Sequence, residues 1–255
     1  MHYARTIPSG GTILAEDIRF EVRLASGDKE IESALRLRFL VFGEELGRAK
    51  GDKRGIECDA HDDACDHLIM SDRDRGQTIG TYRIKGIESA NSLSGFYSND
   101  EFSLETLPPE VLKEGLELGR ACISSDHRNT RAIFLIWKAL ARHLTRSGKR
   151  YFFGCCSIFT NDPAEGERAF RYLKRQGFVH DQISLRPRRP IPPSGRTSNE
   201  TENYKLPGLF EMYLHIGSRV CGPPTYDEQF GTVDFFVVFD LQEMNPKYRE
   251  MFLES

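Results

Sequence analysis

The sequence contains no run of about 18 apolar residues, which is the length that a helix needs to cross a membrane. Its first residues, 1–11, are polar and lack the apolar stretch of a secretory signal peptide. We therefore expect a cytoplasmic protein that has no membrane-spanning segment.

An excess of basic residues is also absent. The chain has 35 Lys and Arg residues against 38 Asp and Glu residues, and its formal net charge is −3. Proteins that bind nucleic acids usually carry a basic excess, so we expect no nucleic-acid partner. Cysteine is sparse, with six residues in 255, and in a cytosolic chain these should be reduced thiols.

What is present is a mixed pattern of strands and helices. Residues 20–24 alternate apolar and charged side chains as a half-buried strand does. Asp28 is a plausible N-cap for a helix over 31–42, before a polar loop over 43–66. The other expected strands are 67–71, 78–84, 116–124, 151–157 and 234–240, and the other expected helices are 131–146, 163–177 and 206–220.

This order of elements predicts an α/β fold with a mixed central sheet flanked by helices. An irregular insertion over 86–115 and a C-terminal helix–strand extension complete it. We expect residues 1–18 to form a flexible arm and residues 19–255 to form one domain. Within that domain, 181–205 is rich in Pro, Arg, Ser and Asn and should form a mobile loop.

Glu117 and Arg120, in the strand over 116–124, are the first candidates for chemistry. A carboxylate held near an amine can orient it or accept its proton. In a regular strand the two side chains would point to opposite faces, and a bulge at Gly119 would change this. The alternative is a structural ion pair.

The turn over 126–130 is the second candidate. Free backbone N–H groups at the start of the following helix, together with Arg128 and Arg131, would make an anion site. A phosphopantetheine arm carries one phosphodiester that such a site could hold. An ordinary basic helix start is the alternative.

Residues 57–67 combine Cys, His and Asp, but their spacing fits none of the common zinc patterns. We expect no metal there, and the run suits either a wall for a positively charged amine or a solvated acidic loop. A cysteine nucleophile is a further possibility, at Cys122 or Cys155. No His or Asn is marked as its partner, which favours buried core thiols.

Taken together, several segments resemble one family. They are 38–47, Asp59 and Asp63, 65–68, 80–83, 96–98, 101–102, 117–122, Trp137, 154–157, 206–209, 220–224, Asp227, 230–231 and Asp234. Over residues 19–252 the chain resembles the bacterial ornithine N-acyltransferases that make lyso-ornithine lipid, often called hemolysin-like proteins. It is more distantly similar to acyl-homoserine lactone synthases and N-acyl amino acid synthases, all of them GNAT-like in fold.

The resemblance implies an enzyme in which the α-amine of an amino acid, ornithine above all, attacks a (3-hydroxy)acyl thioester. Acyl carrier protein would supply the acyl group on its phosphopantetheine arm, with coenzyme A as a possible substitute and no permanently bound cofactor. Because the product is lipid-like, the protein could also contact the inner membrane from the cytoplasmic side. The open alternatives are a related synthase with another amine acceptor and a non-catalytic module that binds acyl chains or carrier protein.

The resemblance also implies roles for single residues. Glu117 would act as the base and Arg120 would hold the carboxylate of the amino acid. The other substrate-binding residues would be Arg38, Phe42, Asp59, Asp66 and Arg83. An acyl tunnel would be lined by Phe96, Tyr97, Phe102 and Trp137, each of which could equally be plain core.

The donor side of the site is implied in the same way. Backbone N–H groups near Ala121, Cys122 and Ile123 would polarise the thioester carbonyl. Because the carrier protein is acidic, it should dock on a basic surface despite the negative net charge. That surface would be formed by Arg128, Arg131, Lys138, Arg142, Lys149 and Arg150.

Overall fold

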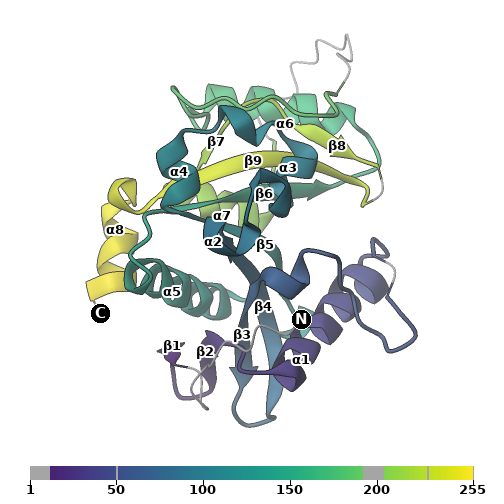
Figure 1. Cartoon of the computed structure of the whole chain (residues 1–255), viewed down its shortest axis with the longest axis vertical. Coiled ribbons are helices and arrows are strands. Elements are labelled where there is room, and N and C mark those ends of the chain that lie inside the picture. Colours follow the sequence, from purple (N-terminus) through teal and green to yellow (C-terminus); the bar gives the residue numbers. More distant parts are fainter. Residues whose placement is uncertain (1–11, 50, 192–203, 229, 255) are drawn as a thin grey trace.

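The computed structural model describes residues 12–49, 51–191, 204–228 and 230–254. Its strands form one sheet in the order β1-β2-β3-β4-β5-β6-β9-β7, and β8 pairs with β9. Helices lie on both sides of this sheet (Figure 1). The predicted mixed α/β architecture is therefore confirmed.

The strands are β1 (Ile13–Glu16), β2 (Phe20–Leu24), β3 (Asp66–Asp72), β4 (Gln77–Gly86), β5 (Gly115–Ile123), β6 (Tyr151–Phe159), β7 (Arg219–Val220), β8 (Thr225–Asp227) and β9 (Thr232–Asp240). The α-helices are α1 (Asp28–Arg38), α2 (Ile87–Ala90), α3 (Ser98–Glu101), α4 (Pro109–Lys113), α5 (Thr130–Arg146), α6 (Ala164–Arg175), α7 (Gly208–Ile216) and α8 (Pro246–Arg249). Two π-helical segments, Phe39–Glu45 and Glu250–Glu254, continue α1 and α8.

Two predicted boundaries are wrong. The helix expected over 206–220 ends at Ile216, because Gly217 adopts a φ of 133° and Arg219 then enters β7. Asp28 is the first residue of α1 and does not cap it, since Gly27 occupies the N-cap position.

The expected arm and the expected mobile loop are described only in part. Residues 1–11 and 192–203 lie outside the described residues. Residues Ile13–Glu16 form β1, which pairs with β2. In the described part of 181–205, Pro187 bridges to Phe102 and Pro190 bridges to Thr225 of β8.

Two helices cover the first half of the sheet on opposite sides. In Figure 1, α5 lies on one side of β3 and β4 and α1 lies on the other. The apolar stripe of α5 includes Leu140 and Leu144, which are fully buried in the largest core. The C-terminal segment packs on the same helix, where Phe134 contacts Phe252 with ring centroids 5.1 Å apart.

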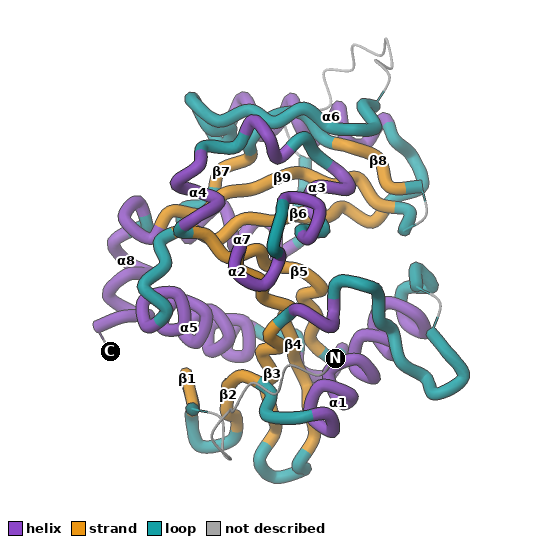
Figure 2. The backbone as a smooth tube through the Cα atoms, in the orientation of Figure 1, coloured by secondary structure: helices purple, strands orange, loops and turns teal. Residues whose placement is uncertain are grey.

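The sheet opens between β5 and β6. These parallel strands are paired only at Gly115↔Tyr151, Leu116↔Phe152 and Glu117↔Phe153, and they separate beyond this point. Gly154 follows the last paired residue of β6 and still lies close to β5, because a Cβ atom there would be 2.3 Å from the carbonyl oxygen of Leu118. Figure 2 shows β5 continuing with β4 while β6 continues with β9.

A bulge in β5 lies just beyond the point of separation. Gly119 pairs with Arg83 and Cys122 pairs with Thr81, so that Arg120 and Ala121 both lie opposite Tyr82. Arg120 adopts a positive φ of 50°, which is uncommon for a residue other than glycine. The bulge breaks the simple strand alternation and re-aims the Arg120 side chain.

Candidate active site

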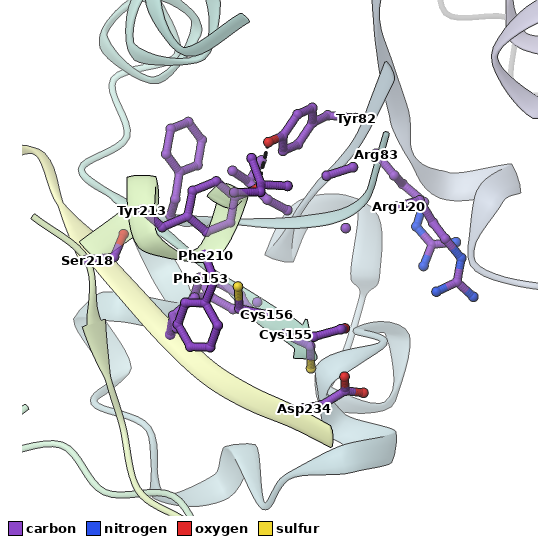
Figure 3. Close-up of a pocket in the computed structure, with 18 of the residues that line it drawn as sticks. Tyr82, Arg83, Arg120, Phe153, Cys155, Cys156, Phe210, Tyr213, Ser218 and Asp234 are labelled. Carbon is purple, nitrogen blue, oxygen red and sulfur yellow. Dashed lines mark hydrogen bonds between the residues drawn. The ribbon is translucent and has the colours of Figure 1, made fainter. Parts of the chain in front are cut away.

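A cavity of about 190 Å³ occupies the opening between β5 and β6. Aromatic and aliphatic side chains from β6, β9, α5 and α7 form much of its lining, and they include Trp137, Phe152, Phe210, Tyr213, Val237 and Phe239. Polar side chains also line it, and they include Arg83, Tyr97, Arg120 and Asp234. In Figure 3, Arg83, Arg120 and Asp234 lie on one side of the cavity, and Phe210 and Tyr213 lie on the other.

The polar side is supported by a buried ionic cluster of three arginines and three carboxylates. Arg38 of α1, which is fully buried, donates to Glu57 through Nε and to Asp62 Oδ1 at 2.6 Å through Nη1. Arg83 of β4 donates to Asp59 Oδ1 at 2.6 Å and to Asp62 Oδ1 at 3.3 Å. The loop before β3 is thereby fastened to α1 and to the sheet.

Arg120 completes this cluster and faces the cavity. Its Nη2 atom donates to Asp59 Oδ2 at 2.8 Å, and its Nε atom lies 3.3 Å from Glu57 Oε1. Its guanidinium also lies between two rings, 5.0 Å from the centroids of both Tyr97 and Phe230. Stacking on aromatic faces suits the planar guanidinium and fixes its orientation.

The charges in the cluster set the protonation state of Asp59. Burial raises the pKa of this carboxyl, but the hydrogen bond and charge of Arg83 and the charge of Arg120 outweigh burial. The net effect holds the pKa of Asp59 well below its ordinary value. Asp59 is therefore ionised across the physiological range and balances the two guanidinium groups.

The aspartate that joins Asp59 in the cluster is Asp62, and not Asp66 as expected. Asp62 pairs with Arg38 and Arg83, as described above. Asp66 begins β3, and its charge acts on His143 of α5. A short 3₁₀ turn over Asp62–Ala64 brings Asp62 back toward the arginines, a local fold that residue spacing alone does not reveal.

Glu117 lies beside the cavity and is not one of its lining residues. The side chain is 5% exposed and accepts two backbone hydrogen bonds, from Tyr97 N at 3.1 Å and from Ser98 N at 2.7 Å. Both carboxylate oxygens are thus engaged at the start of α3. Glu117 holds the segment from which Tyr97 reaches the cavity.

Asp234 of β9 is a cavity residue to which the sequence analysis gave no role. Its side chain is 2% exposed, and its Oδ1 atom has no hydrogen-bond partner among the described residues. Burial, together with the charges of Glu101 and Asp227, raises the pKa of Asp234 to about 7, against the opposing hydrogen bonds of Ser157 and Thr232. The available signal was a carboxylate inside the otherwise apolar run over 233–239.

The aromatic residues expected in an acyl tunnel divide into two groups. Tyr97 and Trp137 line the cavity, and so does Phe42. Phe96 and Phe102 are fully buried in a separate core cluster, where they contact Phe153 and Phe236 with centroids 5.3 Å and 5.7 Å apart. These two residues therefore support the fold and do not border the cavity.

The expected anion site at the start of α5 has its two arginines already engaged. Arg128 pairs with Glu45 through both terminal nitrogens, and Arg131 Nε donates to Asp17 at 2.7 Å. Asn129 caps the helix by accepting from Ala132 N at 3.0 Å. An incoming phosphate would have to displace or share these contacts.

The thiols are poor nucleophiles in this setting. Cys155 lines the cavity and Cys122 packs in a small core cluster. Burial raises the pKa of Cys122 to about 12 and that of Cys155 well above its ordinary value. Because the thiolate is the reactive form, neither residue is activated for covalent catalysis.

Two features are absent from the described residues. No cluster of three or more His, Cys, Asp or Glu side chains there has the arrangement needed to hold a metal ion. None of the helices in the same part of the chain has the length and apolar character required to cross a bilayer.

Comparison with known proteins places the chain in a family. Residues 37–138 match the model of the acetyltransferase (GNAT) domain. The sequence is 31% identical over 245 residues to an L-ornithine N(alpha)-acyltransferase of Brucella abortus, covering 89% of this chain and 86% of the relative. It is 30% identical to the enzyme of the same name from Rhodobacter capsulatus, covering 93% and 96% of the two chains.

A solved structure has a similar fold. The AHL synthase LasI superposes with a TM-score of 0.50 at 15% sequence identity, covering 92% of this chain and 95% of the other. The ornithine acyltransferases are similar over most of both lengths, and residues 37–138 match the GNAT domain model. The chain therefore belongs to the L-ornithine N(alpha)-acyltransferase family and is a GNAT-fold N-acyltransferase.

Proposed function

We propose that this enzyme transfers a (3-hydroxy)fatty acyl group from acyl carrier protein to the α-amine of ornithine, which gives lyso-ornithine lipid. The observation that carries the proposal is the cavity, which joins an apolar interior to a charged side formed by Arg120, Arg83 and Asp234. An acyl chain suits the apolar part and an amino acid suits the charged part. The names of the relatives support ornithine as the acceptor.

The thioester would lie along β5, beyond its last pairing with β6. Ala121 lines the cavity there, and β6 no longer pairs with this stretch of the strand. We propose that backbone N–H groups near Ala121, Cys122 and Ile123 polarise the thioester carbonyl. Such groups stabilise the oxyanion that forms on attack, because they are already aimed when charge develops.

A hydroxyl on the acyl chain would find a hydrogen-bond donor in the cavity. Trp137 is 2% exposed, lines the cavity, and its Nε1 atom has no hydrogen-bond partner among the described residues. Nearby, the hydroxyl groups of Tyr82 and Tyr213 are 2.6 Å apart and satisfy each other. A buried N–H group without an acceptor is costly. The indole N–H therefore supports an acyl chain that carries a hydroxyl group, because the hydroxyl oxygen can accept its hydrogen bond.

The amino acid would bind at the charged side of the cavity. We propose that Arg120 contacts its carboxylate while the ion pair with Asp59 holds the guanidinium in place. In this arrangement the loop before β3 is held against α1 and β4 by the hydrogen bonds that Asp62 accepts from Arg38 and Arg83. Glu117 positions Tyr97 from beneath, through the two backbone hydrogen bonds that it accepts.

Carrier protein would approach the basic residues that follow β5. Arg128, Arg131 and Lys138 belong to the segment that leads from β5 into α5. Complementary charge raises the rate of association and fixes orientation more than it raises affinity. Replacing Arg131 by Ala should therefore raise KM for acyl carrier protein more than it lowers kcat. Added salt should reduce the difference in KM between the variant and the wild-type enzyme.

Contact with a membrane surface would follow from the product, which carries a long acyl chain. Phe159 lines the cavity and is 40% exposed, so the cavity has an apolar residue at the protein surface. Flotation of the purified protein with lipid vesicles tests this part of the proposal. Protein that stays in the lower fractions with and without acyl donor would exclude it.

The test of the reaction uses purified protein, 3-hydroxyacyl and unsubstituted acyl carrier proteins, the matching coenzyme A thioesters, and a panel of amino acids. Mass spectrometry identifies the products. We expect N-acylornithine from the carrier protein donor, with lower yields from coenzyme A. Acylation of another amine would replace ornithine as the acceptor, and no acylation of any amine would refute the enzyme assignment.

A further inference from the structure

Asp234 is a buried carboxylate that lines the cavity and has one oxygen without a hydrogen-bond partner among the described residues. It lies in β9 opposite Ser157 of β6, where it lines the cavity beyond the separation of β5 and β6. It is 2% exposed, and its Oδ1 atom has no hydrogen-bond partner among the described residues. Figure 3 shows its carboxylate on the side of the cavity where Arg83 and Arg120 lie. A buried carboxylate oxygen without a donor is costly unless a ligand supplies one.

The groups around Asp234 favour a positively charged ligand. Negative charge comes from Glu101 of α3 and Asp227 of β8, and burial together with the charge of Asp234 in turn raises the pKa of Tyr97, Cys155 and Cys156. The neighbouring cations are engaged elsewhere. Arg189 pairs with Glu101, and Arg120 pairs with Asp59 and Glu57. An ammonium group would satisfy both the charge and the free oxygen.

We propose that Asp234 binds the α-ammonium of the acceptor amino acid and is the base that takes its proton. The proposal rests on the acyl transfer described above, and it names the residue that performs a step which that reaction requires. A protonated amine has no free electron pair, so one proton must leave before the nitrogen can attack.

The proton balance of the step is as follows. The carboxylate of Asp234 takes one proton from the ammonium, and the freed electron pair forms the C–N bond to the thioester carbon. The resulting oxyanion returns its electron pair to carbon as the C–S bond breaks. The second proton on nitrogen passes to the departing thiolate, and Asp234 releases its proton to solvent before the next turnover.

Asp234 suits this role better than Glu117 does. Both oxygens of Glu117 accept backbone hydrogen bonds, and this side chain does not line the cavity. One oxygen of Asp234 has no hydrogen-bond partner among the described residues, and this residue lines the cavity. In addition, burial raises the pKa of Asp234 to about 7, so that its carboxylate can accept and release a proton near neutral pH.

The test is the pH dependence of kcat/KM in Asp234→Asn and in the wild-type enzyme, with whichever amine the wild type acylates fastest. For the wild type, kcat/KM should rise about tenfold per pH unit below about pH 7 and level off above it, because the base must be ionised. The Asn variant should lose about a hundredfold or more in kcat near pH 8, and the inflection near pH 7 should disappear.

The control is Asp240→Asn. Asp240 ends the same strand but pairs with Arg150 and does not line the cavity. It should keep the wild-type inflection. If Asp234→Asn keeps the inflection too, or raises only KM for the amine, Asp234 is not the base. These outcomes require only that some amine is acylated, so they remain separate from a failure of the ornithine assignment, which the product panel reports.

Discussion

Arg120 donates a hydrogen bond of 2.8 Å to Asp59, although the two residues are 61 positions apart in the sequence. Asp59 also accepts a hydrogen bond from Arg83 at 2.6 Å. The loop that precedes β3 is thus closed onto the bulge of β5, and its carboxylate joins guanidinium groups from two neighbouring strands. The charged side of the cavity depends on this contact.

Asp59→Asn tests that dependence, because it keeps the shape of the side chain and removes the charge. We expect a loss of about 3 kcal/mol in the free energy of unfolding near pH 7, since two arginines lose their shared counter-charge. The wild-type pKa of Asp59 is lowered, so its stabilisation is present above the ordinary value near pH 4 and is lost only at more acidic pH. The deficit, measured by urea unfolding, should therefore persist at about pH 5. A deficit that vanishes there would contradict this account.

Gly154→Ala tests the close approach of β6 to β5 at the edge of the opening between them. A methyl group at this position would lie 2.3 Å from the carbonyl oxygen of Leu118, and backbone atoms cannot yield as a flexible side chain can. We expect a cost of about 1–3 kcal/mol in stability and a loss of acyltransfer, because the strands must shift at the cavity. Gly208→Ala is the control, since a methyl group there has no atom within 4 Å. Equal stability of the two variants would argue against a tight approach at Gly154.

The sequence was informative where local pattern decides the structure. The strands expected over 67–71 and 78–84 are found as β3 and β4, and the helix expected over 131–146 is found as α5. It was uninformative where tertiary pairing decides. A bulge at Gly119 was a possibility from the sequence, but only the pairing with β4 shows that the bulge forms and that Arg120 and Ala121 lie in it.

The candidate site shows the same division. The segment around Arg120 was identified from residue types, and Asp59 was associated with it. Which second aspartate joins them depends on the 3₁₀ turn that brings Asp62 inward, whereas the family resemblance had implied Asp66. The position of Asp234 in the cavity depends on where β6 leaves β5, a property of the folded sheet.

Val237→Phe tests whether the cavity holds the acyl chain. Val237 lines the cavity, whereas its neighbour Val238 points to the opposite face of β9 and belongs to a different core cluster. Val237→Phe should shift the preference of the enzyme toward shorter acyl donors, measured as the ratio of kcat/KM for a short and a long chain. Val238→Phe should disturb packing to a similar degree and leave that ratio unchanged. A shift in both variants, or in neither, would speak against the assignment.

Glu117→Gln separates a positioning role from a role as base. The Gln side chain has one oxygen and one NH₂ group, so it can accept only one of the hydrogen bonds from Tyr97 N and Ser98 N. We expect lower kcat/KM from a displaced Tyr97, with the inflection near pH 7 retained. Loss of that inflection would show that Glu117 is the base. Unchanged turnover would show that Glu117 neither positions Tyr97 for the reaction nor acts as the base.

Asp234→Asn should raise stability while it lowers activity. Burial, with the charges of Glu101 and Asp227, raises the pKa of Asp234 from its ordinary value near 4 to about 7. Between those pH values the folded protein binds the proton more tightly than the unfolded chain does, so stability falls as pH rises, and the full penalty is present above about pH 7.

The Asn side chain does not titrate, and the variant therefore avoids this penalty. We expect similar melting temperatures for the two proteins near pH 4 and a higher one for the variant near pH 8, measured by thermal unfolding in matched buffers. A variant less stable than the wild type at pH 8 would show that the carboxylate has a structural partner. A variant that is more stable and nearly inactive is the result expected when a charge is kept buried for chemistry rather than for folding.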